Sequence, residues 1–213
     1  IEDITKKSFA ENLNTRIVKK IGLKNTSFPT KIDISKNEGY SFAYDGKTWE
    51  KTPEWSSNLA FSAGAMSSTT NDLNLFLEAL LEGKLTSKSS LEQMKSMEDY
   101  YGKGLIIAPF EERKFYGHTG GIENFRAAAG YNPEDKTGFA IIVNGDNYNR
   151  NDIMIGVLNL FYGKEYTFPD LKGFKVSKES LSKYVGIYST PTFPMKITIT
   201  EVNGELLAQA TGQ

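Results

Sequence analysis

Four apolar residues near the start of the chain recur at intervals of four: Phe9, Leu13, Ile17 and Ile21. This spacing places them on one face of a helix and predicts a buried stripe. Ser8 and Glu11 form a capping-box pair before the helix, and Gly22 can end it in the left-handed conformation. Residues 1–5 have the pattern of the end of an earlier helix, which predicts that the chain is part of a longer polypeptide.

Residues 24–60 follow neither a helical nor a strand period and are rich in polar and aromatic side chains. Asp45-Gly46 favours a short hairpin within this stretch. A connection of this length is often a lid or a binding loop, and an irregular surface covering is an equally good interpretation.

Two more helices are predicted between residues 69 and 97. The first starts at a Thr69/Asp72 cap, ends at Gly83, and has apolar residues at Leu73, Phe76, Leu77, Leu80 and Leu81. The second starts at a Ser89/Glu92 box and continues through Leu91, Met94 and Met97.

The apolar period changes after Tyr101 and predicts strands at 104–108, 125–131 and 139–143. The turn-rich link 132–138 predicts an antiparallel hairpin between the last two. A helix follows at 152–162, with one apolar face formed by Ile153, Val157, Leu160 and Phe161. Residues 1–163 are therefore predicted to form an α+β domain, with helices packed on an antiparallel sheet.

Residues 164–175 mix glycine, proline, lysine and aromatic residues and are predicted to be a linker. Beyond it, strands are predicted at 184–189, 195–201 and 205–210, with an Asn203-Gly204 turn joining the last two. So few strands rarely form a stable all-β unit. Residues 176–213 are therefore predicted to be a truncated all-β domain.

The composition of the chain argues against nucleic-acid binding, a metal site and a membrane span. The 25 Lys and Arg residues balance 26 Asp and Glu residues, so the chain has no electrostatic footprint for nucleic acid. With no cysteine and one histidine, neither a metal site nor another cofactor is predicted. No apolar run reaches the roughly 20 residues that a membrane span needs. The lack of cysteine fits the cytosol and the envelope or exterior of a bacterium equally well.

Three motifs that carry serine-hydrolase chemistry are Ser-x-x-Lys, Ser/Tyr-x-Asn and Lys-Thr-Gly. Literal matches are Ser180-Leu-Ser-Lys183, Ser56-Ser-Asn58 and Lys136-Thr-Gly138. None is predicted to function. Lys183 runs into a predicted strand, whereas this motif needs a helical turn; Ser56 lies in the irregular stretch; and Gly138 is expected only to ease a chain reversal.

The histidine lies in Phe115-Tyr-Gly-His-Thr-Gly-Gly-Ile-Glu-Asn-Phe125, between a short apolar run and the strand hairpin. At a sheet edge, Thr119 and Gly120 could present backbone groups to a substrate strand. The Gly121 N–H could approach a developing oxyanion, and the His118 imidazole could bind a carboxylate or transfer a proton. Composition alone favours a turn histidine between hinge glycines.

Five spaced segments together indicate a family resemblance. In chain order they are Gly64-Ala-Met-Ser-Ser-Thr-Thr-Asn-Asp-Leu73, Tyr101-Gly-Lys-Gly104, Gly117-His-Thr-Gly-Gly121, Ala129-Gly-Tyr-Asn-Pro133 and Ile141-Ile-Val-Asn144. In this order they resemble the serine β-lactamase-like family, which includes class C β-lactamases, D-alanyl-D-alanine carboxypeptidases, D-aminopeptidases and related esterases. The resemblance covers residues 1–163. Residues 176–213, with Tyr184-Val-Gly-Ile-Tyr188, resemble the lipocalin-like β domain often appended to such enzymes.

The resemblance implies that His118-Thr-Gly120 stands where the family has Lys/His-Thr/Ser-Gly. His118 would then hold or protonate a small-molecule or peptide substrate, Thr119 would contact its carboxylate, and the Gly121 N–H would form half of the oxyanion hole. Histidine at this position favours a peptidase or esterase over a dedicated β-lactamase.

The resemblance also implies that Ser-x-x-Lys and Tyr-x-Asn precede residue 1. The chain is accordingly expected to be the C-terminal part of a hydrolase and inactive alone. Apolar faces exposed by such a truncation favour homo-oligomerisation or a compensating partner. Periplasmic or secreted bacterial localisation is implied, and a non-catalytic module that binds cell-wall peptide or protein is the alternative.

Overall fold

The computed structural model describes the chain except residues 30, 99–100, 169–175, 191–192 and 212–213. The described residues divide into two compact units, Ile1–Tyr166 and Thr167–Gln213. Residues 169–175 of the predicted linker lie outside the described residues.

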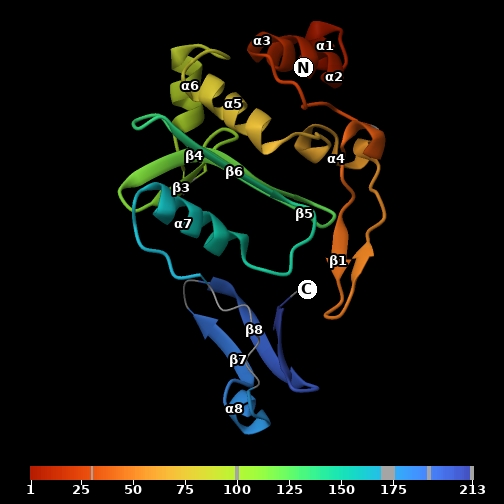
Figure 1. The fold of residues 1–213 in the computed structure, drawn as a ribbon, viewed down its shortest axis with the longest axis vertical. Coiled ribbons are helices and arrows are strands. Elements are labelled where there is room, and N and C mark those ends of the chain that lie inside the picture. Colours follow the sequence, from red (N-terminus) through yellow and green to blue (C-terminus); the bar gives the residue numbers. More distant parts are fainter. Residues whose placement is uncertain (30, 99–100, 169–175, 191–192, 212–213) are drawn as a thin grey trace. The chain divides into compact units, whose positions relative to one another are not determined.

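The first unit contains a four-stranded antiparallel sheet in which neighbours in sequence are neighbours in space, in the order β3-β4-β5-β6 (Figure 1). The strands are β3 (Ile106–Phe110), β4 (Arg113–Ile122), β5 (Phe125–Asn132) and β6 (Thr137–Val143). Helices α5 (Thr70–Leu81) and α6 (Lys88–Lys95) pack on one face, and α7 (Arg150–Phe161) packs on the other. The predicted α+β class is confirmed.

The two faces of the sheet have separate apolar cores. Beneath α5 and α6 the core comprises Leu77, Leu80, Leu81, Leu91, Leu105 and Tyr131. Burial raises the pKa of Tyr131 to about 12, helped by its hydrogen bond to Glu82. On the other face, Phe115 is fully buried against Leu158 of α7. Because side chains alternate along a strand, His118 shares a face with Tyr116, the α5 and α6 side.

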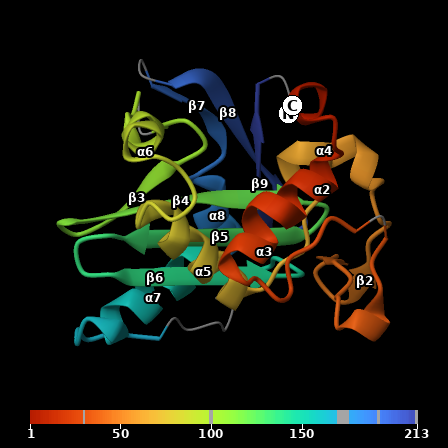
Figure 2. The same ribbon diagram turned by 90° about the horizontal axis from the view of Figure 1, so that it is seen from above.

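The first predicted helix is interrupted. It comprises α2 (Phe9–Leu13), a π-helical turn η1 (Asn14–Val18) and α3 (Lys19–Ile21), after a short α1 (Glu2–Thr5). The predicted Ser8/Glu11 capping box is present, and Gly22 ends the helix with a φ of 73°. Seen from above, α3 lies beside α5 (Figure 2).

The irregular stretch contains more structure than its pattern predicts. It holds a 3-10 turn η2 (Ile34–Lys36) and the strands β1 (Phe42–Tyr44) and β2 (Trp49–Lys51), followed by α4 (Ser57–Gly64). The hairpin predicted at Asp45-Gly46 is confirmed, with Gly46 at a φ of 95°. Helix α4 is kinked at Phe61, whose φ is 38°, and this irregularity explains why no helical period is visible.

Three sequence predictions need adjustment. Helix α6 is capped by Ser87, which accepts a hydrogen bond from the Ser90 N–H, and not by Ser89. Strand β3 begins two residues later than the predicted 104–108. Strand β4 extends beyond the short apolar run Phe115-Tyr116 that its sequence shows, because its glycines remove the alternation of apolar and polar side chains.

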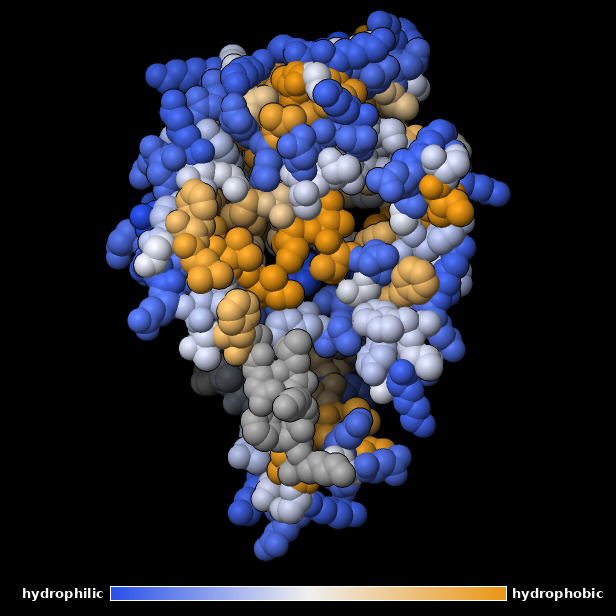
Figure 3. Space-filling view, viewed as in Figure 1, coloured by the Kyte–Doolittle hydropathy of each residue, from blue (hydrophilic) through white to orange (hydrophobic). Residues whose placement is uncertain are grey.

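The predicted buried face of α7 is wrong. Val157 and Phe161 are 57% and 64% exposed, whereas Met154 and Leu158 pack on the sheet. Figure 3 shows apolar side chains gathered at the surface over α7. The helix is apolar on both sides, so its period alone could not identify the inward face.

The role predicted for Gly138 is also wrong. Lys136, with a φ of 55°, takes the left-handed conformation in the β5–β6 turn. Gly138 already lies in β6 opposite Tyr131, and a Cβ there would lie 3.2 Å from the Asn74 Oδ1 atom of α5. The glycine lets α5 approach the sheet closely.

The second unit contains α8 (Lys178–Ser182) and an antiparallel sheet of β7 (Gly186–Thr190), β8 (Phe193–Val202) and β9 (Glu205–Ala210). The predicted Asn203-Gly204 turn is confirmed, since both residues have positive φ. The expectation that Ser180-Leu-Ser-Lys183 lacks a helical turn is wrong, because Ser180 lies on helix α8 and Lys183 is its C-cap. The Ser180 hydroxyl accepts a hydrogen bond from the Ser177 hydroxyl at 3.0 Å.

Candidate active site

The second half of β4 is an open sheet edge. Strand β3 pairs with β4 only as far as Gly117, which faces Ile106, while β5 pairs with β4 through Ile122. In the part of the chain that the structure describes, no strand pairs with residues 118–122 on the side away from β5. The predicted edge position of His118 therefore holds for this half of the strand, whereas Tyr116 and Gly117 have strand partners on both sides.

The glycines of this segment have different surroundings. A Cβ at Gly117 would lie 1.9 Å from the carbonyl oxygen of Ala129 on β5, so only glycine fits there. A Cβ at Gly120 would have no atom within 4 Å. Gly120 shares the face of His118, because the two are separated by one residue on a strand. The surface beside the imidazole is therefore open.

Both ring nitrogens of His118 have partners. Nδ1 lies 2.5 Å from the carbonyl oxygen of Thr119, and Nε2 lies 2.6 Å from the hydroxyl oxygen of Tyr101. A carbonyl oxygen only accepts hydrogen bonds, so Nδ1 carries the proton. In the neutral imidazole, Nε2 then accepts a hydrogen bond from the Tyr101 hydroxyl. Sequence reasoning missed this contact, although Tyr101 opens one of the five quoted segments.

Tyr101 is held by the segment Tyr101-Gly-Lys-Gly104. A Cβ at Gly102 would lie 2.1 Å from the carbonyl oxygen of Met94, in the last turn of α6, and the Lys103 N–H donates to the same oxygen at 3.1 Å. Tyr101 itself forms an isolated bridge with Ile106 at the start of β3. The segment packs between α6 and the start of β3, and these contacts hold Tyr101 beside His118.

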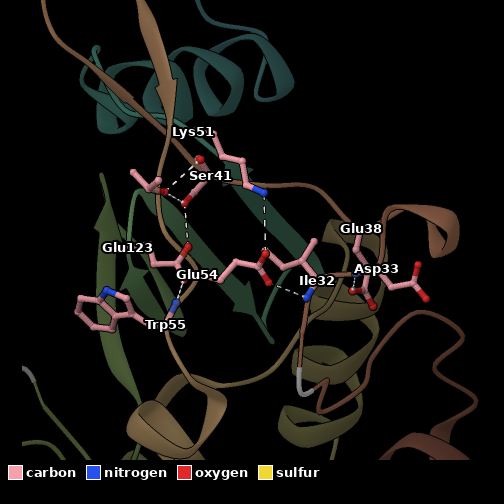
Figure 4. A network of polar contacts seen from close by, with 9 residues as sticks. Ile32, Asp33, Glu38, Ser41, Lys51, Glu54, Trp55 and Glu123 are labelled. Carbon is pink, nitrogen blue, oxygen red and sulfur yellow. Dashed lines mark hydrogen bonds and ion pairs between the residues drawn. The ribbon is translucent and has the colours of Figure 1, made fainter.

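Glu123, in the turn after β4, joins this edge to the excursion that contains β1 and β2 (Figure 4). Its Oε2 accepts a hydrogen bond from the Ser41 hydroxyl at 2.9 Å, and its Oε1 accepts one from the Trp55 N–H at 2.5 Å. Ser41 is only 1% exposed. Glu123 has a φ of 52°, which costs a non-glycine residue about 1–2 kcal/mol and is offset by these bonds.

The excursion is also bound to the end of β6. The Phe42 N–H donates to the carbonyl oxygen of Asn144 at 2.7 Å, and the Asn144 side chain donates to the carbonyl oxygen of Tyr40 at 2.9 Å. Helix α4 contacts β4. The stretch predicted to be a lid, a binding loop or a surface covering thus forms a wall that is hydrogen-bonded to the turn after β4 and to the end of β6.

Removing the carboxylate of Glu123 is expected to loosen this wall. Glu123→Ala leaves the Trp55 N–H without its acceptor, and a hydrogen bond to a charged group contributes about 1.5–3 kcal/mol. Hydrogen exchange of the Trp55 amide should accelerate and the melting temperature should fall. Glu112→Ala, at an exposed glutamate between β3 and β4, is the matched control. Unchanged protection of the Trp55 amide in Glu123→Ala would contradict the anchoring role.

The described ranges contain no group of three or more His, Cys, Asp and Glu side chains that could hold a metal ion. In the same ranges, no helix has the length and apolar character needed to cross a membrane.

The four predicted site residues His118, Thr119, Gly120 and Gly121 lie together on the open half of β4. The three motif matches lie elsewhere. Lys136-Thr-Gly138 begins in the β5–β6 turn, and Gly138 faces Tyr131 of β5, about 7 Å along that strand from Ala129, the partner of His118. Ser56-Ser-Asn58 is at the start of α4, and Ser180 belongs to the second unit.

A sequence profile of the Beta-lactamase family matches residues 1–161, most of the chain, including the open half of β4. The chain belongs to the Beta-lactamase family. The fold of this β-lactamase-family chain is shared with solved structures. A D-stereospecific amidohydrolase from Streptomyces sp. is 25% identical with a TM-score of 0.61, over 68% of this chain and 46% of that one.

Two further solved structures share the fold. The D-amino acid amidase from Ochrobactrum anthropi SV3 is 24% identical with a TM-score of 0.61, over 76% of this chain and 55% of that one. An octameric penicillin-binding protein homologue from Pyrococcus abyssi is 24% identical with a TM-score of 0.63, over 100% of this chain and 50% of that one. The β-lactamase-family chain thus spans about half the length of these proteins.

Proposed function

We propose that this chain is the C-terminal part of a serine acyl hydrolase that works through an acyl-serine intermediate. The observation that carries the proposal is the open edge of β4, where Thr119, Gly120 and Gly121 follow His118, whose imidazole has a defined tautomer. Family membership over residues 1–161 supports it. Because covalent catalysis requires an activated nucleophile, the Ser-x-x-Lys motif is expected upstream of residue 1.

Each site residue has a proposed role. The unpaired backbone edge of residues 118–122 binds the substrate in an extended conformation, with Thr119 contacting its carboxylate. Gly120 leaves room for the substrate, since no atom lies within 4 Å of the position its Cβ would take. The Gly121 N–H donates to the oxyanion, together with the N–H of the nucleophile. His118 supports proton transfer.

The proposed substrates are amides and peptides of D-amino acids, with β-lactams and esters as further acyl donors. Structures with the same fold carry the names D-stereospecific amidohydrolase and D-amino acid amidase, which favours the amide substrates. We also propose that residues 176–213 begin a lipocalin-like β domain after a linker at 164–175. A bacterial protein in the periplasm or outside the cell would meet such substrates in the cell wall.

The test compares this chain with the product of the complete gene. The complete protein is expected to hydrolyse D-amino acid amides, D-Ala-D-Ala peptides, nitrophenyl esters or nitrocefin, and the 213-residue chain alone is expected to be inactive. Ser180→Ala in the complete protein should keep full activity, which would separate this serine from the nucleophile.

Two results would contradict the proposal. Turnover by the 213-residue chain alone would place a nucleophile within it. Failure of the complete protein on all four substrate types, with an upstream sequence that lacks Ser-x-x-Lys, would favour the alternative, a module of the same fold that binds cell-wall peptide or protein without catalysis.

A further inference from the structure

The imidazole of His118 has no nitrogen that faces the open surface without a partner. Nδ1–H donates to the carbonyl oxygen of Thr119 at 2.5 Å, and Nε2 is 2.6 Å from the Tyr101 hydroxyl oxygen. A proton that moves to or from the imidazole at Nε2 must therefore displace Tyr101 or pass through its hydroxyl.

The hydroxyl of Tyr101 is suited to pass a proton on. A phenolic hydroxyl has one proton and two lone pairs, and in this pair the proton is directed at Nε2. The oxygen keeps acceptor capacity toward its other side, and Tyr101 is 51% exposed. Its partner His118 shares a face with Gly120, above which the space is empty to 4 Å. Both members of the pair are exposed, and the phenol occupies the Nε2 side of the imidazole.

The geometry of the pair is built into the fold. The two rings meet edge to face, with centroids 5.5 Å apart and planes at 87°. The backbone next to Tyr101 is held in place, because Gly102 packs closely against the carbonyl oxygen of Met94 in α6. The imidazole is fixed in turn by its bond to Thr119 on β4. Helix α6 therefore holds the Tyr101 hydroxyl, and strand β4 holds the His118 imidazole, at hydrogen-bonding distance from each other.

We propose that Tyr101 is a further catalytic residue, which relays protons between the reacting groups and His118. The proposal rests on the function proposed above. When a nucleophilic hydroxyl or water gives up its proton, a new O–H bond forms at Tyr101 Oη. The existing Oη–H bond breaks, its proton forms Nε2–H, and His118 becomes an imidazolium still bonded to Thr119. The reverse sequence delivers a proton to the leaving amine or alkoxide.

The first experiment measures hydrolysis by the complete protein and its variants. Tyr101→Phe keeps the ring and removes only the hydroxyl. It is expected to lower kcat as much as His118→Ala does, by about 100- to 10,000-fold, and the double variant should be no slower, because both remove the same relay. Tyr116→Phe is the matched control. This tyrosine lies two residues before His118 on the same face, and its variant should keep the wild-type kcat.

The number of protons that move in the rate-limiting step can be measured, and a purely structural role of Tyr101 would not change it. In mixtures of light and heavy water, the wild-type rate should depend on deuterium content as a curve, since two protons move in one step. The residual rate of Tyr101→Phe should follow a straight line. Wild-type kcat in Tyr101→Phe, or multiplying losses in the double variant, would overturn the relay.

The second experiment needs no catalysis. The 213-residue chain has one histidine, so a single pair of imidazole signals, from Nδ1 and Nε2, appears in nitrogen NMR spectra. In the neutral imidazole, Nδ1 should be the protonated nitrogen, and Tyr101→Phe should shift the Nε2 resonance while Tyr116→Phe should not. An unchanged Nε2 signal in Tyr101→Phe would overturn the pair. A wild-type protein inactive on every substrate removes the proposed function and the relay with it, whereas active Tyr101→Phe removes only the relay.

Discussion

Replacing His118 by alanine in the complete protein is expected to lower kcat/KM by about 100- to 10,000-fold, the usual contribution of a positioned acid–base group. Alanine leaves the Tyr101 hydroxyl without the nitrogen that lies 2.6 Å away, and the carbonyl oxygen of Thr119 loses its donor. Steady-state hydrolysis and the rate of acylation, followed as a burst of product, would measure the loss.

His118→Lys separates proton transfer from charge. A lysine supplies donors and a positive charge but has no acceptor while it is protonated. If His118 only held a substrate carboxylate, the lysine variant should recover most of the activity that alanine loses. The relay through Tyr101 predicts instead that lysine leaves acylation slow. An unchanged rate in His118→Ala would make the histidine structural.

Replacing Gly117 by alanine is expected to lower the free energy of unfolding of the first unit by about 3 kcal/mol, at the upper end of the usual cost of overpacking. The new Cβ would lie 1.9 Å from the carbonyl oxygen of Ala129, so the β4–β5 pairing must shift. Both tryptophans, Trp49 and Trp55, lie in this unit. Urea denaturation followed by tryptophan fluorescence therefore reports on it alone.

Gly120→Ala is the matched control on the same strand. With no atom within 4 Å of the added Cβ, its unfolding free energy should stay within about 0.5 kcal/mol of the wild type. In the complete protein, the same methyl group should obstruct the substrate and raise KM. Equal stability losses in the two variants would contradict the packing role of Gly117 and the open surface at Gly120.

Helix caps and tight turns could be predicted from the sequence, because the residues that form them are close together in the chain. The Ser8/Glu11 capping box, the Thr69 cap and the Asn203-Gly204 turn each involve residues within four positions of one another, and all three are present. Helix α5 was predictable because one face is apolar and the other is polar. Helix α7 was not oriented correctly, because Leu158 and Val157 offer apolar surface on both sides.

The site was found in part. Family motifs led to His118, and the structure places it on the open half of β4. Its partner Tyr101 is 17 residues away, and Glu123 binds Ser41 across 82 residues. No period or spacing records contacts of this kind, because they arise from how α6, the excursion and the sheet pack together. Strand β4 has no visible alternation of apolar and polar residues beyond Tyr116, because three of its next five residues are the glycines Gly117, Gly120 and Gly121.

The unpaired edge at residues 118–122 has a consequence for the behaviour of the protein in solution. An edge free to accept an extended substrate can also accept a strand from another protein molecule, the usual first step of sheet-to-sheet aggregation. Only five residues are open, and two of them, Gly120 and Gly121, have no side chain that could pack in such a joint. The shortness of this edge limits self-association while keeping its backbone free.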